Sequence, residues 1–223
     1  MSPKTFQQIV YWPIFATLKL FFNFQIYGRE NIKGLENKPV IFASNHANRI
    51  DGVICGMALP RNSFVPQKFF PIRFLADHQF CNWEKSPFPF PLSILSADFV
   101  NMAGSIPVIS GTKQPLDVVL AEPIKVLKND GKFWIFPEGR MTRDGKLQPG
   151  KRGAVFIHQK TDAILVPVGL INSYKMFSLR NLINFLFKKK KLELKFGKPS
   201  NLKSESVETG TEKLMAEIAR LIS

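Results

Sequence analysis

The sequence lacks the residue patterns of several common classes of site. Its 223 residues include only two cysteines and three histidines, with no C-x-x-C pair, no H-E-x-x-H motif and no Cys/His cluster. A zinc site is therefore not expected, and no metal is predicted. Cys55 and Cys81 are predicted to be free thiols, as is typical of a reducing compartment. No G-x-S-x-G elbow is present, so the sequence offers no serine nucleophile of the α/β-hydrolase type.

Acidic residues are also scarce in this chain. Asp and Glu number 17 against 31 Lys and Arg, which gives a formal net charge of +14. Such a charge favours an anionic partner, which could be nucleic acid, a phospholipid surface or a phosphorylated substrate. The sequence shows no RNP1, helix-turn-helix or zinc-finger pattern. Nucleic acid is therefore not predicted as a partner. We expect an anionic membrane surface instead.

No Gly/Ser/Pro-rich linker and no internal repeat divides the chain, so residues 1–223 are predicted to form a single domain. Apolar, strand-like runs alternate with helical patterns, which predicts an α/β fold with a mixed, mostly parallel sheet flanked by helices. Residues 28–200 are expected to form the core of this fold. Residues 206–223 are predicted to form a C-terminal helix, with a capping box from Thr209 to Glu212.

The N-terminal segment has no long, uninterrupted hydrophobic run. Pro13 and Lys19 interrupt residues 6–24, which is too short and broken for a spanning helix, and no small-residue cleavage site suggests a removed leader. We expect residues 1–24 to contain an apolar helix, or a helix pair, that lies in the membrane interface. The side chains expected near the headgroups are Tyr11, Trp12 and Lys19. In the alternative interpretation, this segment packs on the domain.

A second feature also suits a membrane surface. Residues 188–191 are four consecutive lysines beside Phe185 and Phe187. A lysine run is usually a solvated face, but one beside aromatic residues also suits anionic lipid. Together with the N-terminal segment, it predicts a membrane-associated protein, peripheral or monotopic, on the cytoplasmic face.

The most site-like stretch follows the apolar run of residues 40–43. His46 lies where this expected strand opens into a loop, and Asp51 lies near the start of the next helix. From there, the Asp51 carboxylate can accept a hydrogen bond from one imidazole nitrogen. The other nitrogen would then face outward as a base. The alternative is a loop histidine with satisfied hydrogen bonds and an aspartate that caps a helix.

Four blocks in a fixed order resemble the glycerolipid acyltransferases of the lysophosphatidic acid acyltransferase type. The family is marked by N-H-x-x-x-x-D, then a G-x-I-P-V-type block, then F-P-E-G, and then a V-P-V-type strand. In this chain the blocks are residues 45–51, 104–108, 136–139 and 166–168. The resemblance covers most of the chain, from about residue 28 to residue 169.

The resemblance implies that His46 is the general base and that Asp51 orients it. It implies that a fatty acyl group passes from acyl-CoA or an acyl carrier protein, as co-substrate, to a hydroxyl of a lysophospholipid or glycerolipid, without another cofactor. A hydroxyl needs a base as it attacks, whereas a thiol leaves readily as thiolate. The residues implied to bind substrate are Asn45, Gly104, Ile106, Pro107, Glu138, Gly139 and Arg140.

This chain departs from the family pattern at two positions associated with the phosphate of the acceptor. Ser110 and Met141 stand where many members have arginine. Arg140 is left as the best-placed cation, and Arg143 and Lys151 are possible helpers. We therefore expect acceptors with a singly charged phosphodiester to be used at least as well as lysophosphatidic acid; in the alternative, Arg140 and Arg143 replace the missing arginines. The other class of function that we consider is a non-catalytic lipid- or membrane-binding protein with the same fold.

Overall fold

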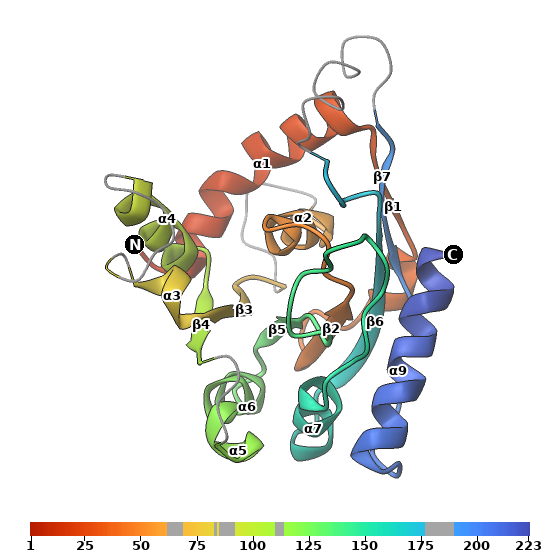
Figure 1. Cartoon of the computed structure of the whole chain (residues 1–223). Coiled ribbons are helices and arrows are strands. Elements are labelled where there is room, and N and C mark those ends of the chain that lie inside the picture. Colours follow the sequence, from red (N-terminus) through yellow and green to blue (C-terminus); the bar gives the residue numbers. More distant parts are fainter. Residues whose placement is uncertain (62–68, 83, 85–91, 110–113, 177–189) are drawn as a thin grey trace.

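The computed structural model describes residues 1–61, 69–82, 84, 92–109, 114–176 and 190–223, without the side chains of residues 92–96. Within these residues, seven strands form one sheet that has helices on both faces (Figure 1). The strands are β1 (Phe24–Tyr27), β2 (Val40–Ser44), β3 (Ile72–Asp77), β4 (Ser105–Val108), β5 (Lys132–Ile135), β6 (Ile164–Ile171) and β7 (Leu192–Phe196).

The sheet is mixed and mostly parallel, as the sequence predicts. The strand order is β1-β7-β6-β2-β5-β3-β4, and the β6–β7 pair is antiparallel while the other described pairs are parallel. All five residues of β2 are buried in the middle of this sheet. Pro107 lies in the edge strand β4, where its missing N–H group is tolerated. Because β2, β5 and β6 are parallel neighbours, the loops that follow them lie together at the carboxyl ends of these strands.

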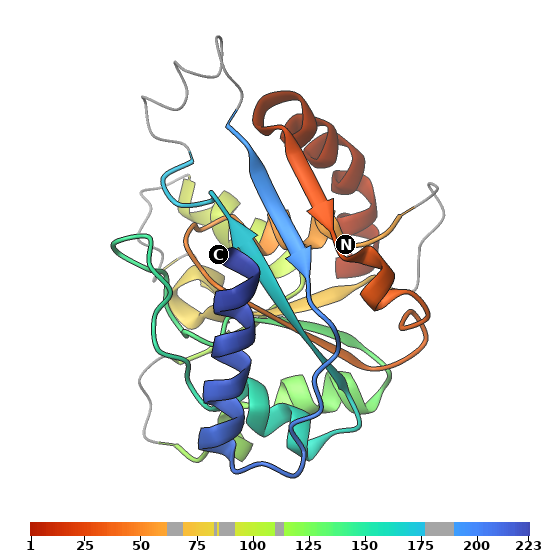
Figure 2. The same cartoon turned by 90° about the vertical axis from the view of Figure 1, so that its right-hand side faces the viewer.

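Helices cover the two faces of the sheet. They are α1 (Pro3–Phe22), η1 (Arg29–Ile32), α2 (Asp51–Ala58), α3 (His78–Cys81), α4 (Leu92–Met102), α5 (Leu116–Val119), α6 (Ala121–Lys128), α7 (Gly153–Lys160) and α9 (Val207–Ile222). Phe42 packs in the core on the α1 and α2 side, whereas the adjacent Ile41 packs in the core on the α7 and α9 side. Successive strand residues thus point to opposite faces. Figure 2 shows α9 lying along β6, away from α1.

The N-terminal segment forms one helix, α1, which packs on the domain. Tyr11 is 1% exposed, and its hydroxyl donates to the backbone carbonyls of Met57 and Leu59, at 3.2 and 3.0 Å, where α2 ends. The prediction that Tyr11 lies near lipid headgroups is therefore wrong. Residues 6–24 are apolar on several sides, so their sequence does not reveal which side faces the core.

The outward side of α1 nevertheless carries a stripe of mostly apolar residues. They recur every three or four positions along the helix and are Thr5, Ile9, Pro13, Ala16 and Leu20, of which Ile9 and Leu20 are 59% and 58% exposed. Lys4, Thr17 and Lys19 are also exposed on α1, and Thr17 and Lys19 flank the stripe. Among the described residues, no helix combines the length and the apolar character that crossing a bilayer requires.

The cap of the C-terminal helix differs from the prediction, and part of the lysine block lies outside the described residues. Helix α9 begins at Val207, and its N-cap is Ser206, whose hydroxyl accepts from the backbone N–H of Thr209. The predicted capping box at Thr209 is therefore wrong, because Thr209 is already inside the helix. Residues 185–189 lie outside the described residues. Of the lysine block, Lys190 donates to a backbone carbonyl and Lys191 pairs with a glutamate.

Candidate active site

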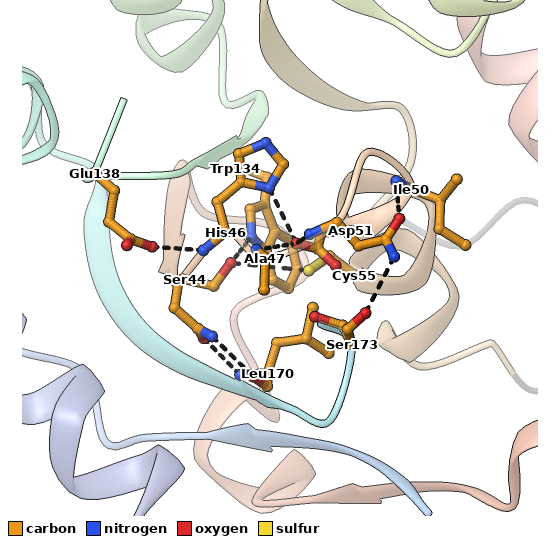
Figure 3. A network of polar contacts seen from close by, with 12 residues as sticks. Ser44, His46, Ala47, Ile50, Asp51, Cys55, Trp134, Glu138, Leu170 and Ser173 are labelled. Carbon is orange, nitrogen blue, oxygen red and sulfur yellow. Dashed lines mark hydrogen bonds and ion pairs between the residues drawn. The ribbon is translucent and has the colours of Figure 1, made fainter. Parts of the chain in front are cut away.

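His46 lies in the loop between the end of β2 and the start of α2. Its Nδ1 atom is 3.0 Å from Oδ2 of Asp51, the first residue of α2 (Figure 3). Asp51 is fully buried, whereas the His46 side chain is 19% exposed. With Nδ1–H donating to the carboxylate, the lone pair is on Nε2. None of the described residues forms a hydrogen bond to Nε2, so this nitrogen is available to a ligand.

The Asp51 carboxylate is fixed by the loop that carries His46. Besides the imidazole, Oδ2 accepts from the backbone N–H groups of Ala47 and Asn48, both at 2.6 Å. The N-cap of α2 is Ile50, which makes no side-chain cap bond. Asp51 therefore does not act as the helix cap of the alternative interpretation. The Asp51 side chain connects the His46 loop to α2 and orients the imidazole.

A buried polar group lies beneath this pair. The Trp134 indole N–H donates to Ser44 Oγ at 2.8 Å, and Ser44 Oγ is 3.8 Å from Cys55 Sγ (Figure 3). Burial raises the pKa of the Cys55 thiol well above its ordinary value, and the nearby Asp51 carboxylate raises it further. The thiol is consequently protonated at neutral pH and is a poor nucleophile.

The F-P-E-G block also meets His46. The Phe136 ring stacks on the imidazole, with centroids 4.2 Å apart and planes at 17°. Glu138 is 2% exposed; Oε1 accepts from the His46 backbone N–H and Oε2 from the Gln148 backbone N–H, each at 2.6 Å. Burial raises the pKa of the Glu138 carboxyl, while the two amide bonds act in the opposite direction. The structure thus brings Glu138 to His46, with its carboxylate on backbone donors.

Asn45 and the residues after Glu138 are at the same edge of the sheet. Asn45 is 8% exposed and exchanges two hydrogen bonds of 2.8 Å with the backbone of Leu170 in β6. Gly139 has φ +64°, and a Cβ atom there would lie 2.9 Å from Lys151 Nζ. The Lys151 side chain therefore packs directly against Gly139. Arg140 is exposed. The substrate-binding roles of these residues stay predictions.

The remaining block, at β4, lies elsewhere. Gly104 precedes β4 and therefore lies at the amino ends of the parallel strands, whereas His46 lies at their carboxyl ends. A Cβ atom at Gly104 would meet a backbone oxygen in β3 and the Gln7 side chain. Ile106 is 5% exposed and packs in the core on the α7 and α9 side. Pro107 is exposed on the edge strand. The structure does not bring Gly104 or Ile106 beside His46, and the predicted role of this block is untested. Ser110 lies outside the described residues.

The loops around His46 carry many cations. These loops follow β2, β5 and β6, and Asp144 is the one exposed acidic residue in their described parts. Their exposed basic residues are Arg49, Arg140, Arg143, Lys146, Lys151, Arg152, Lys175 and Lys191, of which Arg152 and Lys191 pair with glutamates. Such a surrounding favours an anionic ligand. The described residues contain no group of three or more His, Cys, Asp or Glu side chains that could hold a metal ion.

Sequence analysis did not single out three contacts of the site. They are the stacking of Phe136 on His46, the Gln148 amide that donates to Glu138, and the Asn48 side chain, which donates to the Ser173 carbonyl at 3.1 Å. Phe136 is part of the F-P-E-G block, so a signal for it existed. Gln148 contributes a backbone amide, which every residue except proline possesses, so its identity carries no signal.

Comparisons with known proteins agree with this geometry. A family model described as Acyltransferase matches residues 23–171. The chain is 27% identical to the chloroplastic 1-acyl-sn-glycerol-3-phosphate acyltransferase LPAT1 of Arabidopsis thaliana, over 71% of this chain and 41% of that protein. It is 28% identical to a 1-acyl-sn-glycerol-3-phosphate acyltransferase of Borreliella burgdorferi, over 71% of this chain and 54% of that protein. The chain thus spans about half the length of these relatives.

The fold is also similar to a solved structure. The crystal structure of the 1-acyl-sn-glycerophosphate acyltransferase PlsC from Thermotoga maritima has a TM-score of 0.64 to this chain. The match covers 96% of this chain and 76% of that one, at 21% sequence identity. At this identity the likeness concerns the fold.

Proposed function

Since the chain belongs to the Acyltransferase family, we propose that it is an O-acyltransferase that acylates a hydroxyl of a lysophospholipid or glycerolipid. The donor is acyl-CoA or an acyl carrier protein. The observation that carries this proposal is the contact of His46 Nδ1 with the buried Asp51 carboxylate, which leaves Nε2 for the acceptor hydroxyl. The names of the relatives, 1-acyl-sn-glycerol-3-phosphate acyltransferases, suggest lysophosphatidic acid as one acceptor.

In the proposed reaction, His46 is the general base. Its Nε2 takes the proton of the acceptor hydroxyl as the oxygen attacks the thioester carbonyl, and Asp51 stabilises the resulting imidazolium. The tetrahedral intermediate then collapses, the C–S bond breaks, and the thiol leaves with the proton that the imidazolium returns. The products are an ester and a free thiol. No protein nucleophile is needed, which agrees with the protonated state of Cys55.

The basic loops support an acceptor that bears phosphate. A phosphate monoester carries nearly two negative charges, and bidentate arginine contacts would offset its desolvation. Arg140 and Arg143 are exposed on the loop after Glu138, but Ser110 and Met141 stand at the two positions where the family resemblance places arginines for the phosphate. We therefore propose that a singly charged phosphodiester headgroup is accepted at least as well as lysophosphatidic acid.

Incubation with labelled acyl-CoA and a mixture of lysolipids, with products identified by mass, tests the reaction and the acceptor together. We expect phosphodiester acceptors to be acylated at rates comparable to lysophosphatidic acid, and His46→Ala to lose about 10²- to 10⁴-fold in rate while its melting temperature is retained. Exclusive acylation of lysophosphatidic acid, abolished by Arg140→Ala, would contradict the acceptor proposal. Transfer by His46→Ala at the wild-type rate would contradict the mechanism.

We also propose that the protein binds the cytoplasmic face of the membrane through the outward stripe of α1. Ile9 and Leu20 are exposed on this stripe, and the net charge of +14 favours anionic lipid. Ile9→Glu and Leu20→Glu together should reduce flotation with anionic vesicles, whereas Lys160→Glu, which makes the same change in net charge at an exposed position of α7, should reduce it less. Equal flotation of the double variant and the wild type would place the membrane contact elsewhere.

A further inference from the structure

The F-P-E-G block contacts both the main chain and the ring of His46. We propose that Glu138 is a positioning residue that acts through His46 and does not bind the acceptor. This inference rests on the proposed function, because it assigns the residue a role in that reaction. It departs from the expectation, based on family resemblance, that Glu138 contacts the acceptor.

The contacts of Glu138 are with backbone on both sides. Oε1 accepts from His46 N–H and Oε2 from Gln148 N–H, each at 2.6 Å, in a side chain with 2% exposure. These are short, charge-assisted bonds, which are stronger than bonds between neutral groups. Because the side chain is almost fully buried and each oxygen already accepts a backbone amide, the carboxylate offers little accessible surface to a substrate.

The other residues of the block serve the same arrangement. The N–H of Gly139 donates to the Phe136 carbonyl at 2.9 Å, which closes a turn with Pro137 at its second position. Gly139 adopts φ +64°, which glycine tolerates, so the chain turns away directly after Glu138. Phe136 stacks on the imidazole ring. Phe136 and Glu138 thus contact His46 directly, while Pro137 and Gly139 form the turn that carries Glu138.

The same loop holds the other backbone group of His46. The N–H of Thr142 donates to the His46 carbonyl at 2.9 Å. Both main-chain polar groups of the base are thus bound by residues 138–142, while Asp51 binds its ring. A base must be placed to within a fraction of an ångström, and a displacement of about 1 Å can cost on the order of 10²-fold in rate.

Glu138→Gln tests the inference, because the amide keeps the size of the side chain but only one of its two oxygen acceptors. We expect kcat to fall about 10- to 100-fold, with the acceptor KM within about twofold of wild type. Hydrolysis of the acyl donor without acceptor, in which His46 would activate water in place of the acceptor hydroxyl, should fall in parallel. Glu138→Asp should behave similarly, because its charge is kept but its reach is shorter. Glu212→Gln, an exposed change on α9, should leave all these values unchanged.

An acceptor ligand would give a different result. If Glu138→Gln raised the acceptor KM, recovered full kcat at saturating acceptor and left donor hydrolysis unchanged, the inference would be overturned. Wild-type kinetics in Glu138→Gln would overturn it as well. Phe136→Leu, which removes the ring that stacks on the imidazole, should also lower kcat without changing the acceptor KM. If Glu138→Gln folds poorly, amide hydrogen exchange at His46 in the wild type provides the second test.

Amide hydrogen exchange in the wild-type protein tests the contact independently of activity. The His46 amide should exchange at least about tenfold more slowly than the amide of Arg143, an exposed residue of the loop after Glu138, and exchange at equal rates would contradict the Glu138 bond. If the wild type showed no acyl transfer with any donor, the proposed function would fail. Protection of the His46 amide would still report on the contact itself.

Discussion

Asp51→Asn removes the negative charge of the Asp51 side chain but keeps its size and shape. In the transition state the imidazole of His46 becomes a cation whose Nδ1 lies 3.0 Å from Asp51 Oδ2. At a charge separation of about 4 Å and an effective dielectric constant of about 20, their attraction is about 4 kcal/mol. Loss of this attraction corresponds to about a 10³-fold fall in kcat. Asparagine keeps an oxygen for the Ala47 and Asn48 amides, so the fold should persist.

The assay is the initial rate of acyl transfer at saturating donor and acceptor, measured with a thermal melt of each variant. Asp162→Asn is a suitable control, because Asp162 is exposed and pairs with Lys203 far from the site; it should retain the wild-type rate. A folded Asp51→Asn enzyme with a rate within tenfold of wild type would show that the carboxylate does not stabilise an imidazolium. In that case His46 would not act as the base in the way proposed.

Two further predictions concern stability. Tyr11→Phe removes a buried hydroxyl that donates to the carbonyls ending α2, and it should lower the unfolding free energy by about 1 kcal/mol, seen as a fall of about 2 to 4 °C in Tm; an unchanged Tm would show that the hydroxyl is not needed there. His158 is buried, with Nδ1 donating to the Ala163 carbonyl and Nε2 accepting from the Leu202 amide, and burial lowers its pKa. The unfolded chain therefore binds a proton first, so stability should fall as the pH drops below about 6.5. Urea midpoints between pH 5 and 7.5 should show a shallower acid slope in His158→Gln, and equal slopes would contradict this assignment.

Local sequence signals were sufficient for the strands and for the contact between His46 and Asp51. The apolar run before His46 forms a fully buried central strand. Asp51 lies at the helix start, where its carboxylate can reach the ring of a histidine five residues earlier. Both inferences used spacings of a few residues, over which backbone geometry leaves few alternatives.

Contacts between distant segments were not predictable in the same way. The Glu138 carboxylate meets an amide 92 residues earlier in the chain, and Asn45 pairs with a strand residue 125 positions away. The sequence shows that these residues follow strands but does not show which atoms meet. The N-terminal segment illustrates another limit, because Tyr11 suits a lipid headgroup and a buried carbonyl equally well. Only the packing of α1 against α2 decides between them.

Helix α2 connects the packing contact of α1 with the His46–Asp51 pair. Its first residue is Asp51, and the Tyr11 hydroxyl on α1 is fastened at its other end. Eight residues at 1.5 Å each give a rigid spacer of about 12 Å. A shift of α1 against the domain would therefore be carried to the Asp51 carboxylate, and so to His46, through one rigid helix.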